Sequence, residues 1–388
     1  MSSSAATVAR GLGLVVTEVA RAGANRVVPG GGSLPLRATD VSPRWLEGAL
    51  GLRPGAIRGV RIVDEHSGTA ARARVAVDAH DDTGLPDHLF VKSTPHSYAQ
   101  HVLMNLFGLG ANEVLAYGAL GDDPPVRVPR LYAGQVDRRW GRNIMVLEDL
   151  SETARFRTVV DSVTTAEAEA VVDAMAELHV AFWETARFDG DLAPLTGRAP
   201  AANLLGDAIR RRLLGNMKGQ AVDLVPAPTR QHCRIFFERS TDIDVFWGSQ
   251  PQTLLHGDPH LGNLFFEGDT PGFLDWQVAL AGAGVRDVAY FANASVEPDL
   301  LRIIERGLVE RYAARLDAAD VPADADHLWT LYRAGITELF LAAVATSETG
   351  ESMQPQAVSR VGVERAVAGV VAHDSFGVLT ALVDGKAV

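Results

Sequence analysis

The stretch from Leu254 to Gln277, LLHGDPHLGNLFFEGDTPGFLDWQ, sets histidine, aspartate and asparagine residues among short apolar runs. Polar and charged side chains are costly to shelter from water unless a hydrogen bond, an opposite charge or a bound ligand compensates them. The flanking runs TLL, LFF and FL have the length and composition of short buried strands. This stretch therefore predicts a functional site held between strands.

Three residues of this stretch, His256, Asp258 and Asn263, fit the pattern H-x-D-x-x-x-x-N. The catalytic loop of kinases has this spacing, because the loop turns back so that its aspartate accepts a hydroxyl proton while the asparagine oxygen reaches Mg²⁺. Asp275 follows in FLDWQ, where a kinase has an aspartate that holds Mg²⁺ between nucleotide phosphates. The intervening segment predicts a hairpin that brings Asn263 and Asp275 side by side. Two oxygen ligands suit Mg²⁺ when phosphates and waters complete its shell.

The sequence upstream offers a lysine and a glutamate that match the next parts of a kinase. Lys92 is an isolated charge in the apolar strand LFVKS, and Glu113 lies near the start of the following predicted helix. In kinases, a lysine in this place contacts the nucleotide phosphates and is held by a glutamate of that helix. We therefore expect Lys92 and Glu113 to pair and to serve a nucleotide.

Two further segments have the positions of nucleotide contacts. The turn formed by Ser67, Gly68 and Thr69 separates two predicted strands, so its backbone N–H groups and hydroxyls are placed to lie over phosphates. The strand IMVLEDL precedes the change to helical sequence, and the backbone from Glu148 to Leu150 is placed to meet adenine.

The pattern of apolar residues divides the chain into three parts. Residues 1–38 form a lead-in, and residues 39–148 have the alternation of three strands, a helix and two strands. In residues 149–388 the apolar spacing is mostly helical, and clear strands occur only around the polar stretch described above. We expect a small β-rich lobe with a nucleotide-binding sheet, followed by a large helical lobe with the catalytic loop and the acceptor site.

The motif HGDPHLGN…LDWQ, with AELHVAFW upstream and GVRDVAYF downstream, resembles the aminoglycoside phosphotransferase and choline kinase superfamily, nearest to its phosphotransferase or ecdysteroid-kinase-like branch. The resemblance extends from about Val60 to Leu341. It implies an α+β, protein-kinase-like bilobal fold with a small β-rich N-lobe and a large, mainly helical C-lobe. It also implies ATP and Mg²⁺ as cofactors, and transfer of the γ-phosphoryl group to a hydroxyl of a small molecule.

The resemblance gives roles to residues of this chain: Asp258 as the catalytic base, Asn263 and Asp275 as metal ligands, and Lys92 with Glu113 as the phosphate-contacting pair. The turn at Ser67 departs from the protein-kinase pattern G-x-G-x-x-G, since Gly68 is its one glycine. In this superfamily a turn with serine or threonine often replaces that loop, which makes Ser67 and Thr69 candidate phosphate contacts.

Composition limits the partners of the chain. A formal net charge of −12 argues against nucleic acid or an anionic membrane as the main partner, because both attract basic surfaces. Cys233 is the single cysteine of the sequence, which excludes an intramolecular disulfide and a zinc site of several cysteines. We find no signal peptide and no apolar run approaching the ~18 residues of a membrane span, and we expect a cytoplasmic protein.

Two alternative functions stay open at this point. His256, Asp258 and His260 also form H-x-D-x-H, a possible metal site of a hydrolase, although Pro259 favours a loop and further ligands are lacking nearby. An ATP-binding pseudokinase is the second alternative, but such proteins usually lack the base, the metal aspartate or the lysine. We expect an enzyme, with His256 bonded to the loop backbone and Asp287 holding the loop. The sequence leaves the acceptor and the oligomeric state open.

Overall fold

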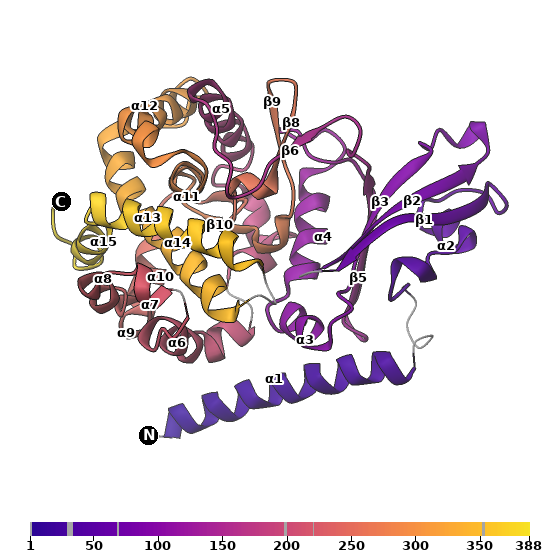
Figure 1. Cartoon of the computed structure of the whole chain (residues 1–388), viewed down its shortest axis with the longest axis horizontal. Coiled ribbons are helices and arrows are strands. Elements are labelled where there is room, and N and C mark those ends of the chain that lie inside the picture. Colours follow the sequence, from indigo (N-terminus) through magenta and orange to yellow (C-terminus); the bar gives the residue numbers. More distant parts are fainter. Residues whose placement is uncertain (1, 29–33, 68–69, 198–199, 220, 351–353) are drawn as a thin grey trace. The chain divides into compact units, whose positions relative to one another are not determined.

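The computed structural model describes residues 2–28, 34–67, 70–197, 200–219, 221–350 and 354–388 (Figure 1). The chain divides into two compact units. The N-terminal unit comprises Met1–Pro124, Val128–Thr153 and Arg198–Leu204, and the C-terminal unit comprises Pro125–Arg127, Ala154–Gly197 and Leu205–Val388. Each unit is described by itself below.

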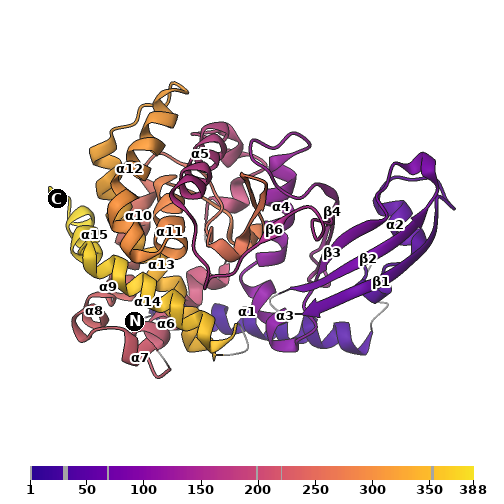
Figure 2. The ribbon, with the colours of Figure 1, turned by 45° about the horizontal axis from the view of Figure 1, so that its top comes forward.

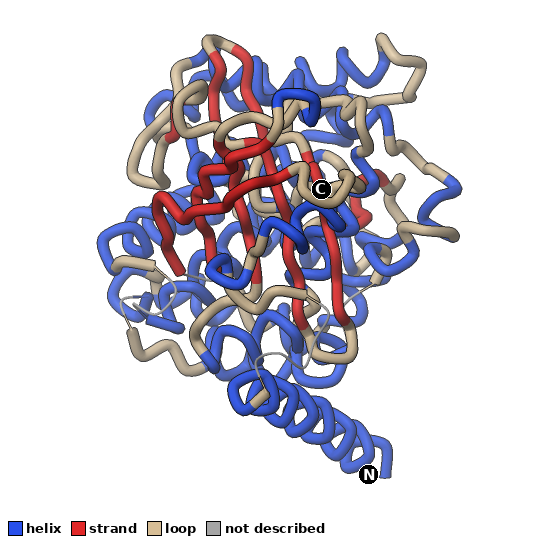
Figure 3. The backbone as a smooth tube through the Cα atoms, turned by 90° about the vertical axis from the view of Figure 1, so that its right-hand side faces the viewer, coloured by secondary structure: helices blue, strands red, loops and turns tan. Residues whose placement is uncertain are grey.

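The N-terminal unit is built on a five-stranded antiparallel sheet with strand order β1-β2-β3-β5-β4. Figure 3 shows these strands side by side in one layer. Their bounds are β1 (Ile57–Ser67), β2 (Ala71–Ala79), β3 (His88–Ser93), β4 (Leu131–Asp137) and β5 (Arg142–Glu148). Every second residue of β2 is buried from Ala71 to Val77, as expected for a strand with one face on a core. α2 (Pro43–Ala49), whose N-cap is Ser42, packs beside β1.

The helix α4 (Leu109–Leu120) packs on β4 and β5 and carries Glu113. Its Gly110 lies directly against Asn143 of β5, because a Cβ on this glycine would come within 2.3 Å of the Asn143 side chain. The missing side chain thus lets the helix approach the sheet closely. The shorter helix α3 (Tyr98–Leu106), which the sequence analysis does not predict, precedes α4.

The predicted lead-in contains a helix, α1 (Ser2–Val27), which belongs to the N-terminal unit and packs against α3. The Tyr98 hydroxyl donates to the carbonyl of Val19 at 2.6 Å. Buried Arg142, at the start of β5, donates to the Asn25 side chain at 2.5 Å. These bonds attach α1 to α3 and to β5 of the sheet.

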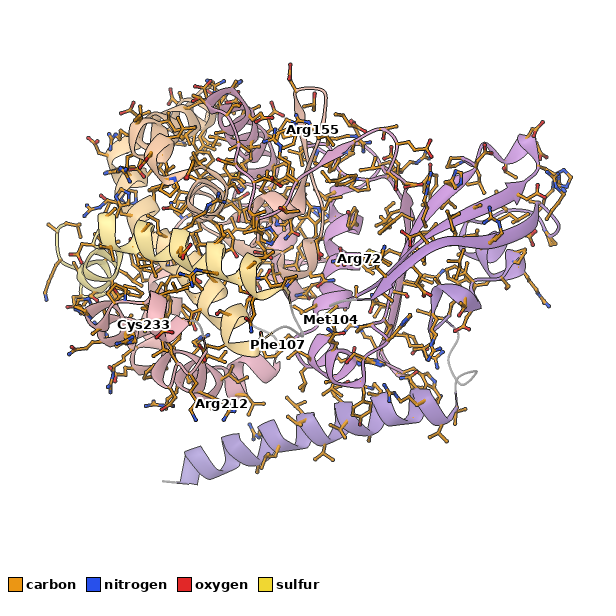
Figure 4. The ribbon with its side chains drawn as sticks, viewed as in Figure 1. Arg72, Met104, Phe107, Arg155, Arg212 and Cys233 are labelled. Atoms are coloured by element: carbon orange, nitrogen blue, oxygen red, sulfur yellow. The ribbon has the colours of Figure 1, made fainter. Side chains whose placement is uncertain are left out.

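The C-terminal unit is mostly helical. Its helices are α5 (Thr165–Ala181), α6 (Pro200–Gly215) from Leu205 onward, α7 (Ala221–Leu224), α8 (Ala227–His232), α9 (Ile235–Glu238), α10 (Ser240–Gly248), α11 (Val285–Ser295), α12 (Pro298–Asp317), α13 (Ala325–Thr349), α14 (Gln356–Ala372) and α15 (Ser375–Val383). Figure 2 shows α11, α13 and α14 side by side, and these helices pack on one another. Cys233 directly follows α8 and is buried (Figure 4), and burial raises the pKa of its thiol to about 11.

Two small antiparallel sheets surround the polar stretch. One pairs β7 (Thr253–Leu255) with β10 (Leu280–Gly282), and the other has the order β6-β8-β9, formed by β6 (Arg155–Phe156), β8 (Leu264–Glu267) and β9 (Thr270–Phe273). β7, β8 and β9 confirm the strands predicted there, whereas β6 and β10 are too short to show in the sequence pattern. Near the C-terminus the helical sequence forms two helices instead of one, because the chain breaks between α14 and α15 at Asp374, which adopts a left-handed φ of 46°.

The helix α13 is apolar and long enough to cross a membrane, and so is the bent pair of α14 and α15. The sequence analysis expects no such segment. Of the most apolar window of α13, 56% is buried inside the protein, and the helix packs against α11, α12, α14 and α15. This burial is typical of the core helix of a soluble protein, so α13 does not indicate a membrane.

Candidate active site

A loop in the C-terminal unit carries the polar motif from the end of β7 to the start of β8. Gly257 makes the first turn of this loop with a φ of +83°, a conformation that favours glycine. A Cβ at this position would also lie 2.4 Å from the carbonyl oxygen of Val278. The loop therefore needs glycine at Gly257 to direct the following residues.

Asp287, on α11, anchors the start of this loop. Its two carboxylate oxygens accept the backbone N–H groups of His256 at 2.6 Å and Gly257 at 3.0 Å. Asp287 is 1% exposed, and the Nε2 atom of His179 lies 3.5 Å from its Oδ2. Thus Asp287 holds the loop through its backbone, as the sequence analysis expects.

His179 is in turn positioned by a contact with Tyr312. Its Nδ1 atom lies 2.9 Å from the hydroxyl of Tyr312, on α12. Gly284 leaves room for this contact, since a Cβ there would come within 2.2 Å of the Tyr312 hydroxyl and 2.8 Å of His179 Nδ1. Burial raises the pKa of Tyr312 well above its ordinary value, and the charge of Asp287 adds to this effect. Tyr312 therefore remains a neutral phenol behind the loop.

His256 has a structural role, as predicted. Its Nε2–H donates to the carbonyl of Leu274 at 2.7 Å, and its Nδ1 accepts the backbone N–H of Asp258 at 3.2 Å. Burial lowers the pKa of His256, although Asp287 and other nearby acceptors oppose the shift. The ring is therefore neutral, and both of its nitrogens are engaged within the loop.

Asp258 has two carboxylate oxygens with different partners. Oδ1 accepts a hydrogen bond of 2.5 Å from the Tyr290 hydroxyl, and Oδ2 accepts one of 3.2 Å from Nδ2 of Asn263. The Nε2 atom of His260 lies 3.6 Å from Oδ2. The Asp258 side chain is 32% exposed, so it is oriented by neighbours and still open to a reactant. This arrangement suits a proton acceptor.

Tyr290 is a site residue that the sequence analysis does not identify. Burial raises the pKa of Tyr290 well above its ordinary value, and the charge of Asp258 raises it further. Tyr290 is therefore a hydrogen-bond donor at all physiological pH values. Its signal in the sequence is helical spacing, because Tyr290 lies three residues after Asp287 and thus on the same face of α11.

The β8–β9 hairpin confirms the predicted turn between the two candidate metal ligands. Leu264 pairs with Phe273, and the N–H of Leu274 donates to the carbonyl of Asn263 at 2.8 Å. Asp275 therefore follows the residue that lies opposite Asn263. Its φ of 61° is left-handed, which is uncommon for a residue other than glycine and is often found at functional sites.

The residues of the hairpin fit Mg²⁺. The amide nitrogen of Asn263 donates to the backbone carbonyl of Asp258 at 2.9 Å and to its carboxylate, which directs the amide oxygen away from these bonds. That oxygen and the carboxylate of Asp275 are hard donors of the kind that Mg²⁺ prefers. Within the described residues, no group of three or more histidine, cysteine, aspartate or glutamate side chains is placed to hold a metal. The donor set thus suits an ion whose remaining ligands come from phosphates and water.

Lys92 and Glu113 form the predicted pair in the N-terminal unit. The Lys92 ammonium donates to Oε1 of Glu113 at 2.7 Å, and the two residues are 4% and 1% exposed. Burying two opposite charges gains little stability over apolar side chains of similar size, so such a pair is better explained by a function.

The other predicted nucleotide contacts have mixed outcomes. Ser67 ends β1, where it pairs with Ala71 of β2, and Gly68 and Thr69 lie outside the described residues. The N–H of Glu148 donates to the carbonyl of Arg130 at 2.9 Å, so this donor is used within the unit.

The carbonyl of Leu150 accepts the N–H of Thr153 at 3.2 Å, and Leu150 itself is buried. Contacts from the segment between Glu148 and Leu150 to adenine stay a prediction.

Comparisons with known proteins place this geometry in context. No curated protein sequence matches the chain significantly. Among solved structures, an ethanolamine kinase from Plasmodium vivax is similar with a TM-score of 0.53 and 12% identity, covering 91% of this chain and 95% of that chain. A candidate aminoglycoside phosphotransferase from Ralstonia eutropha JMP134 is similar with a TM-score of 0.51 and 16% identity, covering 85% of this chain and 96% of that chain.

A choline kinase from Streptococcus pneumoniae has a lower TM-score of 0.48, with 14% identity over 82% of this chain and 95% of that chain. At such identities, the two solved structures with the higher scores show the fold alone, and they confirm the expected kinase-like fold. The sequence profile of the phosphotransferase enzyme family matches residues 77–331, well over half of the 388 residues. This match extends from β2 past the loop of Asp258, and the chain therefore belongs to the phosphotransferase enzyme family.

Proposed function

We propose that this protein transfers the γ-phosphoryl group of ATP, with Mg²⁺, to a hydroxyl group of a small molecule in the cytoplasm. The hydroxyl oxygen would form a bond to the γ-phosphorus while the bond from that phosphorus to the bridging oxygen of ADP breaks. The proton of the hydroxyl would pass to Asp258. Family membership supports phosphoryl transfer, and the motif and its geometry support ATP and Mg²⁺.

The observation that carries this proposal is the arrangement of hydrogen bonds around Asp258. Tyr290 holds Oδ1 and Asn263 contacts Oδ2, while about a third of the side chain remains exposed. A base must be held within hydrogen-bond reach of the proton that it accepts, and this carboxylate is held from two sides.

Asn263 and Asp275 would hold the metal through an amide oxygen and a carboxylate. Bound Mg²⁺ would supply positive charge that neutralises the phosphates of the nucleotide. The hydrogen bond from Asn263 to Asp258 would keep the asparagine oxygen directed toward the metal.

The N-terminal unit would contribute the nucleotide contacts. Lys92 would bind the phosphates, and Glu113 would fix its ammonium group through the bond of 2.7 Å. The segments of Ser67, Gly68 and Thr69 and of Glu148 to Leu150 would add contacts to the phosphates and the adenine, respectively.

The test is Mg²⁺-dependent turnover of ATP with a panel of hydroxyl compounds, including aminoglycosides, sugars, choline, hydroxy acids and sterols. Product is identified by mass, with Mg²⁺ present or chelated. We expect a phosphorylated product from at least one class, and only with Mg²⁺. Tight binding of Mg·ATP without product from any acceptor would favour an ATP-binding module instead.

The geometry gives no support to a metal-dependent hydrolase. Both ring nitrogens of His256 are engaged within the loop, so this histidine is not placed to bind a metal together with Asp258 and His260. Zinc binding in the absence of nucleotide would contradict this conclusion, and isothermal titration with ZnCl₂ measures it.

A further inference from the structure

Arg286 lies on the face of α11 that carries the contact with the catalytic loop. It precedes Tyr290 by four residues, and side chains four residues apart are neighbours on a helix. About 6 Å of helix axis separates the two positions. Because the Tyr290 hydroxyl is bonded to Asp258, a ligand of a few carbon atoms can span from Arg286 to the region of Asp258.

Glu338, on α13, belongs to the same cluster. One of its carboxylate oxygens lies 3.4 Å from a terminal nitrogen of Arg286. Burial raises the pKa of Tyr290 most, the charge of Asp258 adds to it, and the charge of Glu338 contributes as well, so Glu338 also faces Tyr290. Gly335, one turn before Glu338, allows this approach, because a Cβ there would already lie 3.2 Å from Ala289 of α11.

The donors of Arg286 are largely unmatched. Its side chain is only 16% exposed, yet it makes no hydrogen bond to the described residues, and its Nε is buried without an acceptor among them. Its contacts there are the long pair with Glu338 and a stack on Trp247, with 5.1 Å from the guanidinium carbon to the ring centroid. A guanidinium has five N–H donors, and a buried donor without an acceptor lowers stability.

Arg127 and Arg311 of the C-terminal unit differ from Arg286 in this respect. Arg127 donates through two nitrogens to Glu267 at 2.7 and 2.9 Å, and Arg311 donates through two nitrogens to Asp173, both at 2.7 Å. The rigid fork of Arg286 is therefore held in place by Trp247 while its hydrogen-bonding capacity remains for a ligand.

We propose that Arg286 binds a carboxylate of the phosphoryl acceptor, so that the acceptor is a small hydroxy acid. This inference rests on the proposed function. A planar carboxylate matches the fork of a guanidinium with two parallel hydrogen bonds. Glu338, only 3.4 Å from Arg286, disfavours a more highly charged group such as a phosphate.

The same cluster disfavours a cationic acceptor. The ring face of Trp247 on which an organic cation would stack is occupied by Arg286, and Glu338 is the near counterion of Arg286. An amino alcohol would therefore meet a positive charge in this place. Small hydroxy acids and amino alcohols thus have opposite expected outcomes in one assay.

The test compares matched acceptors with the wild-type protein: a series of short hydroxy acids, the neutral amide of each, and amino alcohols of the same chain length. Mg·ATP-dependent phosphorylation is measured as kcat/KM. We expect the kcat/KM of at least one hydroxy acid to exceed that of its own amide by about 10-fold or more. A site that binds a charged group discriminates against an analogue that lacks the charge. Equal or faster turnover of amides or amino alcohols would overturn the inference and leave the proposed function intact. Absence of product from all of these acceptors, with phosphorylation of a sugar, aminoglycoside or sterol, would overturn the inference alone. Absence of product from every compound of both panels would overturn the proposed function as well.

Variants at Arg286 test whether this residue binds the carboxylate of the acceptor. Arg286→Gln is expected to raise the KM for the hydroxy acid about 10-fold or more and to leave the Kd for ATP unchanged, with partial recovery in Arg286→Lys. A higher Kd for ATP with an unchanged acceptor KM would mean that Arg286 serves the nucleotide, and the inference would be wrong.

The matched control is Arg306→Gln. Arg306 also stacks on a tryptophan of the same unit, with its guanidinium carbon 5.4 Å from the centroid of Trp329, and it pairs with Glu310 and Asp326. This variant loses the same charge and a similar stack, and we expect its acceptor KM to match the wild type. A rise equal to that of Arg286→Gln would show a general effect of charge and would contradict the assignment.

Discussion

The two oxygens of Asp258 have different environments, which is the central residue-scale feature of the site. Oδ1 accepts from a phenol that stays protonated, so this bond is permanent. Oδ2 has a longer bond to Asn263 and lies near His260. The carboxylate therefore has a fixed orientation with one oxygen more available to a substrate hydroxyl.

Tyr290→Phe removes the bond to Oδ1 and keeps the ring. We expect kcat to fall about 10-fold, because a misplaced catalytic group loses part of the advantage of orientation, while the Kd for ATP stays the same. Steady-state kinetics and a calorimetric titration measure the two quantities.

Tyr332→Phe is the control for this change, since Tyr332 is also buried and accepts a hydrogen bond, from Asn293, at 2.9 Å. It should cost stability and leave kcat unchanged. A Tyr290→Phe variant with wild-type kcat would show that the tyrosine does not position Asp258.

Whether a contact in the site can be predicted from the sequence depends on how many residues separate the two partners along the chain. His256, Asp258 and Asn263 lie within one short loop, so their spacing carries the motif. The bond between Tyr290 and Asp258 spans 32 residues, and the contact of His179 with Tyr312 spans 133. Such contacts depend on helix packing, which a single sequence does not show.

At the scale of elements, α5 has a capping box at its start and carries, in its last turn, a histidine that supports the loop of Asp258. Thr164 and Glu167 form a capping box at its start, with reciprocal bonds of 2.9 and 3.2 Å. Burial alone would raise the pKa of Glu167, but hydrogen bonds from Thr164, Arg157 and Arg155 outweigh it and lower the pKa to about 2. The last turn of α5 carries His179, which lies against Asp287.

Glu167→Gln is therefore expected to lower the free energy of unfolding by about 1 kcal/mol, because it weakens the capping box and removes the charge that faces two arginines. Urea unfolding at neutral pH measures this change. Glu177→Gln, at an exposed position of the same helix, should stay within about 0.5 kcal/mol of the wild type. Equal effects of the two substitutions would contradict the role of the cap.

The sequence predicts helices and strands well where the apolar residues recur with a clear period and where capping residues mark the helix ends. The cap at Ser42, the five strands of the N-terminal sheet and the start of α5 follow from local pattern. α1 and α3 are missed, since their apolar residues lie in mixed polar sequence. The break at Asp374 is missed as well, because aspartate carries no strong signal for a left-handed conformation.

At the scale of the whole molecule, each unit contains one part of the site that we propose. The N-terminal unit holds the pair of Lys92 and Glu113, and the C-terminal unit holds the loop of Asp258 with its supports. The motif order and the change from strand to helical pattern predict the kinase-like fold. The acceptor class that we propose is not predicted from sequence, because Arg286, Trp247 and Glu338 come together only through packing of α10, α11 and α13.

The stability of the molecule should depend on pH through two buried histidines. Burial lowers the pKa of both His256 and His101 below the ordinary value of 6.5. Below pH 6.5 the unfolded chain therefore binds protons that the folded chain does not, so the free energy of unfolding falls as pH decreases, by up to about 1.4 kcal/mol per pH unit for each group.

Urea unfolding between pH 7 and 5 measures this slope. His256→Gln removes one titrating group and should reduce the slope, whatever its effect on stability at pH 7. An identical slope in wild type and His256→Gln would mean that His256 is not held neutral in the fold.

The measurement that tests the account most directly is the turnover of Asp258→Asn together with its affinity for Mg·ATP, using an acceptor found with the wild-type protein. We predict that kcat falls by about 10²-fold or more, as expected for loss of a positioned base, and that ATP binding is retained. Asp269→Asn, at an exposed position of the β8–β9 turn, is the control and should turn over as the wild type does. Wild-type turnover in Asp258→Asn would contradict the assignment of Asp258 as the proton acceptor and, with it, the proposed mechanism.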